Sequence, residues 1–240
     1  MYDRTLDDRK LTFGVSGKLW KNVLVMYDRQ TGSLWSHLTG EAVVGPLTGQ
    51  RLKTYPAAMM TWSEWRSLHP QTLVLEKPAG GRGMRDPYED YYYSARTGII
   101  PEKHRDSRLH PKTWIVGLVL DGRAKAYPFP ALDRTGVLND RFGGRELAVT
   151  YCKEARSGAV FDRHLEEKTL TFGPDPAEEA SCRFMRDKET GSRWQRLTGA
   201  AVEGPMKGRR LAQLTSTQSF WFGWKDYYPK SEVFSAESSK

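Results

Sequence analysis

Residues 11–52, LTFGVSGKLWKNVLVMYDRQTGSLWSHLTGEAVVGPLTGQRL, recur 159 residues later as residues 170–211, LTFGPDPAEEASCRFMRDKETGSRWQRLTGAAVEGPMKGRRL. The copies align without a gap, and the match extends to residues 1–75 and 160–234. Trp35, Trp62 and Trp65 recur as tryptophans, which predicts duplicated core anchors. Glycines 32, 40, 45 and 49 also recur, at positions expected to need a positive φ or a close backbone approach. The repeat therefore predicts two pseudo-equivalent lobes packed together.

Each copy has the pattern of short strands joined by tight turns. Residues 23–29 (VLVMYDR) are rich in β-branched and aromatic side chains, which is typical of a buried strand. Residues 30–33 supply a turn with Gly32 at its tip, and residues 34–38 return to complete a hairpin. Residues 41–47, 51–55 and 72–75 are three further predicted strands.

One short helix interrupts this strand pattern in each copy. Thr61 is a suitable N-cap, and Glu64 completes a capping box three residues later. Trp62, Trp65 and Leu68 then share one face, and Pro70 ends the helix. The second copy keeps the tryptophan spacing. The predicted class is α+β, predominantly antiparallel β, with two pseudo-repeated strand-rich lobes that each carry one short Trp-bearing helix.

The second copy has a front half that the first copy lacks. Residues 114–120 and 123–127, separated by Asp121-Gly122, predict a hairpin. Residues 130–139 predict a short helix or turn, and residues 146–152 another strand. Met1 aligns with Val160, so the first copy begins in mid-module. We expect that about 46 residues of an upstream half, and a targeting segment, are absent because an internal Met was taken as the start.

These patterns predict four parts along the chain. The first repeat covers residues 1–75 and is incomplete, a tyrosine-rich connector covers 76–110, the complete second repeat covers 111–236, and 237–240 form a tail. The connector contains Gly80-Gly81-Arg82-Gly83 and the tyrosines 88, 91, 92 and 93. A flexible linker has little use for four tyrosines, so we expect part of it to pack on a lobe. Stacking of these rings on a sugar or a base is the alternative.

Composition bounds the class of protein. The 240 residues carry a net charge of +8, but the basic residues are interspersed with acidic ones, so a mixed solvated surface is favoured over nucleic-acid binding. No apolar run approaches the roughly 18 residues of a membrane span, and no signal-peptide pattern is present. The two cysteines, Cys152 and Cys182, are too few for a disulfide framework or a closed zinc site, and they leave the redox compartment undecided.

Several motifs together resemble one family. FGVSG (13–17), VMYDR (25–29), SLWSHLTGEAVVGPLTG (33–49), DPYEDYYYS (86–94), GRAKAYPFPAL (122–132) and VLND (137–140) look like the domain of unknown function 3179 family of bacteria and archaea. Because members commonly carry an export or lipoprotein signal, the resemblance implies a periplasmic or extracellular location. It also implies a Tyr-Cys-Pro-Leu-Cys strand and a His-Glu pair. Residues 151–155 keep the first cysteine alone and residues 133–140 have no histidine, so a metal or thiol site there would be incomplete.

Positions where the copies differ are the candidates for function, since positions kept in both serve mainly structure. The candidate binding residues are Ser16, Asn22, Tyr27, His37 and Glu41, which become Asp175, Ser181, Arg186, Arg196 and Ala200 in the second copy. Such a copy has lost groups suited to proton transfer, so a site is expected in the first repeat. A plain turn around Ser16 and a packed or surface His37 are the alternatives.

Two further groups have structural interpretations. Asp28 and Asp187 precede Thr-Gly in both copies and are expected to cap turns. Cys152 is expected to be an inert buried thiol, with reactivity or metal binding as the alternative.

Two classes of function remain open. The first is a ligand-binding or interaction module with a polar pocket in the first repeat, whose partner is an unknown small ligand or protein. The alternative is a hydrolase or metal-dependent enzyme whose site is completed by an absent upstream half. No cofactor or metal-ligand set is identified from the residues.

Overall fold

Strands dominate the computed structural model, which describes residues 1–76, 88–94, 96–178 and 182–235. Its sheets are almost wholly antiparallel and its four α-helices are short. The predicted α+β class with two repeated strand-rich lobes is thus confirmed. Within these ranges, no helix is both long and apolar enough to cross a membrane.

The repeat builds the same four-stranded sheet twice. In the first copy the order is β3-β4-β5-β6, and in the second it is β14-β15-β16-β17, with antiparallel pairing throughout. The first sheet comprises β3 (Phe13–Trp20), β4 (Val23–Asp28), β5 (Leu34–Ser36) and β6 (Ala42–Val44). The second comprises β14 (Phe172–Pro174), β15 (Phe184–Asp187), β16 (Arg193–Gln195) and β17 (Ala201–Glu203).

A small hairpin precedes each of these sheets. The hairpins are β1 (Thr5–Leu6) with β2 (Arg9–Lys10), and β12 (His164–Leu165) with β13 (Lys168–Thr169). Within the described residues, the expected strand at 51–55 is reduced to two isolated bridges, Glu41–Arg51 and Tyr2–Thr54.

The repeated glycines and the first repeated tryptophan behave as predicted. All eight glycines have positive φ, for example 105° at Gly45 and 87° at Gly204. A Cβ at Gly204 would lie 2.8 Å from the Cα of Ser192, so close backbone approach and left-handed conformation both require glycine there. Trp35 and Trp194 are fully buried, each in the apolar cluster of its own sheet. Local sequence therefore determined these features in both copies.

The front half of the second copy forms a separate core between two sheets. The orders are β18-β11-β10-β9 and β19-β7-β8-β20, and the chain passes from one sheet to the other between β18 and β19. Val116, Tyr127, Leu147 and Val160 pack between them. The strands are β7 (Trp114–Leu120), β8 (Arg123–Pro128), β9 (Val137–Phe142), β10 (Arg145–Cys152), β11 (Ser157–Asp162), β18 (Ala212–Leu214), β19 (Ser216–Phe220) and β20 (Glu232–Val233). The predicted hairpin and the strand at 146–152 are confirmed, and the short helix is α3 (Phe129–Thr135).

The Trp-bearing helices are α1 (Trp62–Leu68) and α4 (Trp221–Tyr227), at matching positions in the repeat. Thr61 caps α1, because its hydroxyl accepts a hydrogen bond from the backbone N–H of Glu64 at 3.3 Å. The prediction that all duplicated tryptophans are core anchors is wrong for α1, where Trp62 is 50% and Trp65 37% exposed. In the second copy the front half covers the tryptophans of the helix, whereas in the first copy the two indoles stay partly exposed among the described residues. The closing strand expected at 72–75 does not form either.

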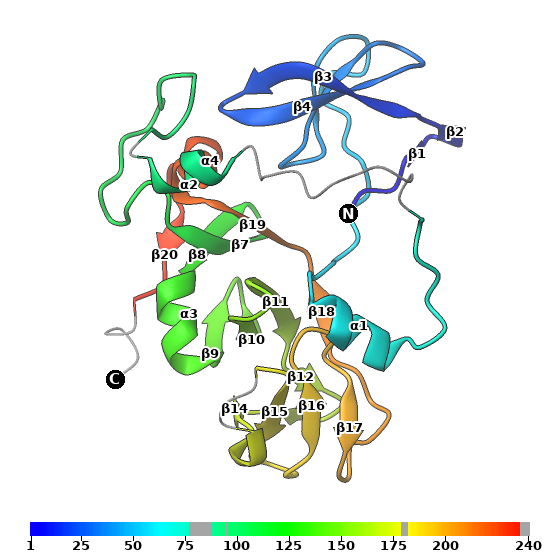
Figure 1. Cartoon of the computed structure of the whole chain (residues 1–240), viewed down its shortest axis with the longest axis vertical. Helices are drawn as coiled ribbons and strands as arrows, with labels where there is room; N and C mark the ends of the chain where they lie inside the picture. Colours follow the sequence, from blue (N-terminus) through cyan, green and yellow to red (C-terminus); the bar gives the residue numbers. More distant parts are fainter. Residues whose placement is uncertain (77–87, 95, 179–181, 236–240) are drawn as a thin grey trace.

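Each helix instead contacts the sheet of the other copy. The α4 residue Tyr227 donates its hydroxyl to the carbonyl of Trp20 at 2.9 Å and receives a hydrogen bond from Ser36 at 3.3 Å. The α1 residue Glu64 accepts a hydrogen bond from Gln195 Nε2 at 2.7 Å. Figure 1 shows α4 beside the β3–β4 hairpin and α1 against the sheet of the second copy. Ser36 and Gln195 are equivalent positions of the repeat, so the exchange is reciprocal.

Part of the connector packs on the lobes, as expected. Asn22 of the first copy exchanges two hydrogen bonds with the backbone of Ile100, at 2.7 and 2.8 Å. The short helix α2 (Glu89–Tyr93) places Tyr91 and Tyr92 beside Phe220, with ring centroids 6.4 Å apart in each case. The glycine-rich residues 80–83 and the tail at 237–240 lie outside the described residues.

Candidate functional site

The predicted first-repeat residues Ser16 and Asn22 have structural partners. The hydroxyl of Ser16 donates to the carbonyl of Val25 on the neighbouring strand and accepts from the backbone N–H of Lys18. Asn22 sits in the β3–β4 turn at a φ of 61°, where its amide holds Ile100 of the connector. Both side chains stabilise local backbone in this structure.

The other three predicted residues have separate surroundings: Tyr27 lies on β4, His37 in the turn after β5 and Glu41 just before β6. The Tyr27 ring covers Gly14, where an added Cβ would lie 2.6 Å from the ring. His37 is exposed, and its carbonyl accepts a hydrogen bond from the Tyr2 hydroxyl at 3.0 Å. Glu41 forms an ion pair with Arg51 at 2.5 Å. None of the five predicted residues lines the aromatic cavity described below.

The differences between the copies reflect a charged cluster. Asp175, the counterpart of Ser16, is fully buried and pairs with Arg193 at 2.5 Å and with Arg186, the counterpart of Tyr27, at 3.2 Å. Burial alone would raise the pKa of Asp175, but hydrogen bonds from the Ala177 N–H and the two guanidinium groups hold it below its usual value. The exchange of Ser and Tyr for Asp and Arg is thus a coupled structural replacement. Ser181, the counterpart of Asn22, lies outside the described residues.

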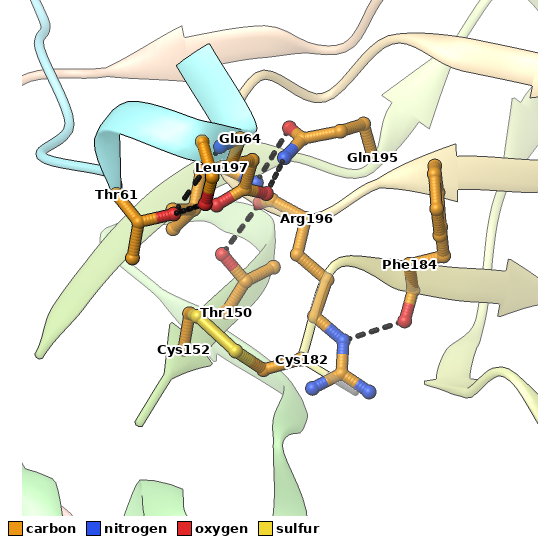
Figure 2. The surroundings of a disulfide bond; sticks show 10 residues. Thr61, Glu64, Thr150, Cys152, Cys182, Phe184, Gln195, Arg196 and Leu197 are labelled. Atoms are coloured by element: carbon orange, nitrogen blue, oxygen red, sulfur yellow. Dashed lines mark hydrogen bonds between the residues drawn. A yellow bond between two sulfur atoms is a disulfide. The ribbon is translucent and has the colours of Figure 1, made fainter. Parts of the chain in front are cut away.

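The two cysteines form a disulfide, which corrects the expectation of an inert buried thiol at Cys152. Figure 2 shows the bond between Cys152 and Cys182 beside the side chain of Arg196, the counterpart of His37. Arg196 is 5% exposed; its Nε donates to the Phe184 carbonyl at 2.7 Å and its own carbonyl accepts from Thr150 Oγ1 at 2.8 Å. Cys182 is a residue of the repeated stretch and Cys152 of the front half, so the disulfide ties the two parts of the second copy together.

The equivalent aspartates of the two copies, Asp28 and Asp187, cap turns, as predicted. Asp28 accepts hydrogen bonds from the Thr31 N–H at 2.6 Å and from Trp35 Nε1 at 2.9 Å, and Asp187 repeats both contacts with its own threonine and tryptophan. Burial alone would raise the pKa of Asp28, but the hydrogen bonds from Trp35 and Thr31 outweigh it and lower the pKa. A carboxylate held ionised by fixed donors is suited to structure, not to proton transfer.

An aromatic cavity of about 460 Å³ lies where the connector and both copies meet. Trp114 of β7 and Phe220 of β19 form its centre, with ring centroids 4.4 Å apart, and Phe129 stacks on Trp114 at 6.1 Å. Tyr92 and Tyr93 of α2, Met59, Lys112, Ala155 and Arg156 complete the lining. Met59 belongs to the first copy, and its N–H is tied to Ser157 Oγ at 3.1 Å.

The two cations of the cavity differ in their partners. Lys112 Nζ already has protein partners, because it donates hydrogen bonds to the carbonyls of Tyr91 and Ser94 and lies 3.9 Å from the Tyr91 ring centroid. Arg156 is exposed, its backbone N–H donates to the Lys153 carbonyl, and its guanidinium makes no hydrogen bond or ion pair with any residue that the structure describes. The tyrosines of the connector were the sequence signal for this site. Trp114, Phe129 and Phe220 gave no sequence signal for the site, because aromatic residues in strands and helices usually belong to the hydrophobic core.

Buried charges elsewhere are satisfied by protein partners. Lys225 of α4, 2% exposed, pairs with Glu102 at 2.8 Å, and Asp226 accepts from the N–H groups of Lys103 and His104. Lys125 pairs with Asp140 at 2.6 Å. In the described ranges, no three His, Cys, Asp or Glu side chains are grouped so that they could hold a metal ion.

Comparison with known proteins gives one match. The model of the family described as "Protein of unknown function (DUF3179)" matches residues 1–121 and again residues 114–240. No curated protein and no solved structure matches the chain. The double match agrees with the internal repeat seen in the sequence and in the two sheets.

Proposed function

The chain belongs to the DUF3179 family of proteins of unknown function, and on that premise we propose that it is a binding module for a small organic anion with a flat apolar ring. The observation that carries the proposal is the aromatic cavity. Trp114, Phe129 and Phe220 form its walls, and the guanidinium of Arg156, also in its lining, makes no hydrogen bond or ion pair among the described residues. The cavity volume lies within the range of ordinary small-molecule sites, roughly 300–1,000 Å³.

The side chains specify the chemistry of this ligand. Aromatic side chains stack on flat rings and bury much apolar area. A guanidinium at the rim binds a carboxylate or phosphate through two parallel hydrogen bonds, and such charge-assisted bonds are worth about 1.5–3 kcal/mol. A ligand that carries an anionic group at the edge of a flat apolar ring system would satisfy both features.

A pair of probes tests the proposal. The chain should bind 2-naphthoate more tightly than uncharged 2-naphthamide, by about 10- to 100-fold, as measured by saturation-transfer NMR and tryptophan fluorescence. Arg156→Gln should remove this preference and leave the weak naphthamide binding unchanged. Arg9→Gln, which removes an exposed cation from the β1–β2 hairpin, is the matched control and should keep the preference. Equal affinity for both probes would refute the anion-binding role.

The polar pocket in the first repeat stays a prediction. Its most exposed member is His37, so His37→Ala should weaken binding if a ligand contacts that sheet. The enzymatic alternative, a site completed by an absent upstream half, also stays a prediction. Two buried carboxylates of the described residues, Asp28 and Asp175, give it no support, because both are held by fixed donors.

The disulfide supports the location implied by the family resemblance. Disulfides persist in oxidising compartments and are rare in the cytosol, so we place the protein outside the cytoplasm. Thiol titration of protein taken directly from its native cells should find no free thiol under denaturing conditions, without added reductant. Two free thiols would contradict this location.

A further inference from the structure

Helix α1 presents an apolar face that its counterpart buries. Trp62 and Trp65 are 50% and 37% exposed, whereas the equivalent Trp221 and Trp224 of α4 are 0% and 1% exposed. Single exposed apolar residues are common on proteins, but two indoles side by side on one helix are not. The repeat therefore offers a direct comparison of one helix with and without its cover.

Exposed apolar residues also follow α1 in the sequence. Leu73, Val74 and Leu75 are 95%, 67% and 94% exposed. Their counterparts are Glu232 and Val233 of β20, which pair in parallel with β8, and Phe234, which is 9% exposed. The stretch thus forms a paired sheet edge that ends in a buried phenylalanine in one copy, and an unpaired apolar segment in the other.

The cover of α4 is known in detail, because it comes from β7 and β8. Trp221 and Trp224 pack with Ile115, Ala124 and Ala126. At Gly117 an added Cβ would lie 2.3 Å from the Trp224 ring, so the strand needs glycine where the indole rests. A partner for α1 must offer the same small-residue surface on a two-stranded ribbon.

From these observations we infer that Trp62, Trp65 and residues 73–75 form a docking surface for a partner polypeptide, a strand-rich half built like residues 114–159. The stoichiometry argues against a second copy of this chain as occupant. Among the described residues, each chain has two Trp-bearing helices but one such half, and that half already covers α4. The docking surface is also continuous with an existing interface, since Glu64 on the same helix is held by Gln195.

A fusion supplies this half in the register of the repeat. Residues 114–159 are added directly before Met1, because Met1 aligns with Val160. Hydroxyl-radical footprinting then reports the oxidation rate of each tryptophan. Trp62 and Trp65 should become at least fivefold slower to oxidise and approach Trp221 and Trp224. Gly117→Val in the added copy alone is the matched control, and it should restore the rates of the unfused chain because the new methyl groups occupy the place of the Trp65 ring.

The result that overturns the inference is unchanged oxidation of Trp62 and Trp65 in the fusion. Unchanged oxidation overturns the inference even if the added strands are not protected from hydrogen exchange, because the inference expects those strands to fold by docking on α1. A second measurement uses the chain without the fusion. Trp62→Gln with Trp65→Gln should leave the melting temperature within about 2 °C, whereas Trp221→Gln with Trp224→Gln should abolish the transition or lower it by more than 10 °C.

Equal losses in the two double variants would mean that the α1 face is already occupied within the chain, and would overturn the inference. A dimer in sedimentation that the α1 double variant dissociates would identify a second copy as the occupant, and would overturn it as well. A monomer with an unchanged melting temperature, together with protection in the fusion, would support it.

Discussion

Replacing Asp28 with asparagine should lower the free energy of unfolding by about 2–4 kcal/mol. Asp28 is fully buried and accepts three hydrogen bonds, from the Thr31 N–H at 2.6 Å, the Thr31 hydroxyl at 2.9 Å and Trp35 Nε1 at 2.9 Å. Asparagine has one acceptor oxygen, so its NH₂ group must face at least one of these donors, which costs about 1–3 kcal/mol. The remaining bonds become neutral, which costs about 1 kcal/mol more.

The pH dependence gives the same prediction a second readout. The pKa of Asp28 is lowered in the folded protein, so the stability contributed by its ionised form is fully present above the unfolded value of about 3.9 and is lost as the pH falls through the folded pKa. The asparagine variant has no ionised carboxylate at this position, so it has no such contribution to lose as the pH falls. The difference in unfolding free energy between the two proteins should therefore shrink when urea titrations at pH 7 are repeated at about pH 3.

The repeat provides an internal control for this experiment. Asp187→Asn removes the same contacts to Thr190 and Trp194 and should cost a similar amount at pH 7. The reasoning is refuted if Asp28→Asn stays within about 0.5 kcal/mol of the unmodified chain, the size of an ordinary surface substitution. A difference that is constant between pH 7 and 3 would refute the electrostatic part alone.

Two further substitutions follow from the geometry. Gly204→Ala should lower the free energy of unfolding by about 2 kcal/mol or more, because φ is 87° and the new Cβ would lie 2.8 Å from Ser192 Cα. Gly208→Ala, at a φ of 86° but with open space around the new Cβ, should lower it by about 1 kcal/mol. Equal losses of the two variants in chemical denaturation would contradict the role of the Ser192 contact. Replacing Cys152 and Cys182 with alanine opens a link of sequence separation 30 and should lower stability by about 3–4 kcal/mol in the loop-entropy estimate; an unchanged unfolding midpoint would show that the disulfide does not form.

Features set by local sequence could be predicted from either copy. The turn after Asp28, the capping of α1 by Thr61 and the positive φ of Gly45 each depend on a few neighbouring residues. Because the repeat copies these neighbours together, it copies the geometry too. The burial of Trp35 in its own sheet follows for the same reason.

Features that depend on distant partners could not be predicted. Trp62 and Trp221 have the same local sequence pattern, but strands outside the repeated stretch cover only the second of them. The capping box fails in part for a similar reason, because the carboxylate of Glu64 bonds Gln195 of the other copy. Periodicity identifies an apolar face, but it cannot say what covers that face.

Divergence between the copies, which points to candidate residues in the first repeat, has two physical meanings. Ser16 and Tyr27 differ from Asp175 and Arg186, which suggests lost chemistry when the positions are considered one at a time. In space Asp175 is a buried carboxylate paired with Arg186 and with Arg193, and a buried charge is costly unless it is paired, so this difference between the copies has a structural reason. The aromatic cavity, by contrast, joins residues from three parts of the chain that no sequence motif connects.

The helices make reciprocal contacts between the two copies despite this divergence. Ser36 and Gln195 are the same sheet position, and each contacts the helix of the other copy, but through a tyrosine hydroxyl in one case and a glutamate carboxylate in the other. The two sheet positions are equivalent, but the helix groups that they bond are different. The docking of each helix on the opposite sheet therefore depends on the geometry of sheet and helix, not on one conserved bond. Either lobe on its own would expose the surface that receives the other copy's helix. The helix contacts therefore make the two copies one structural unit, with the aromatic cavity at their junction.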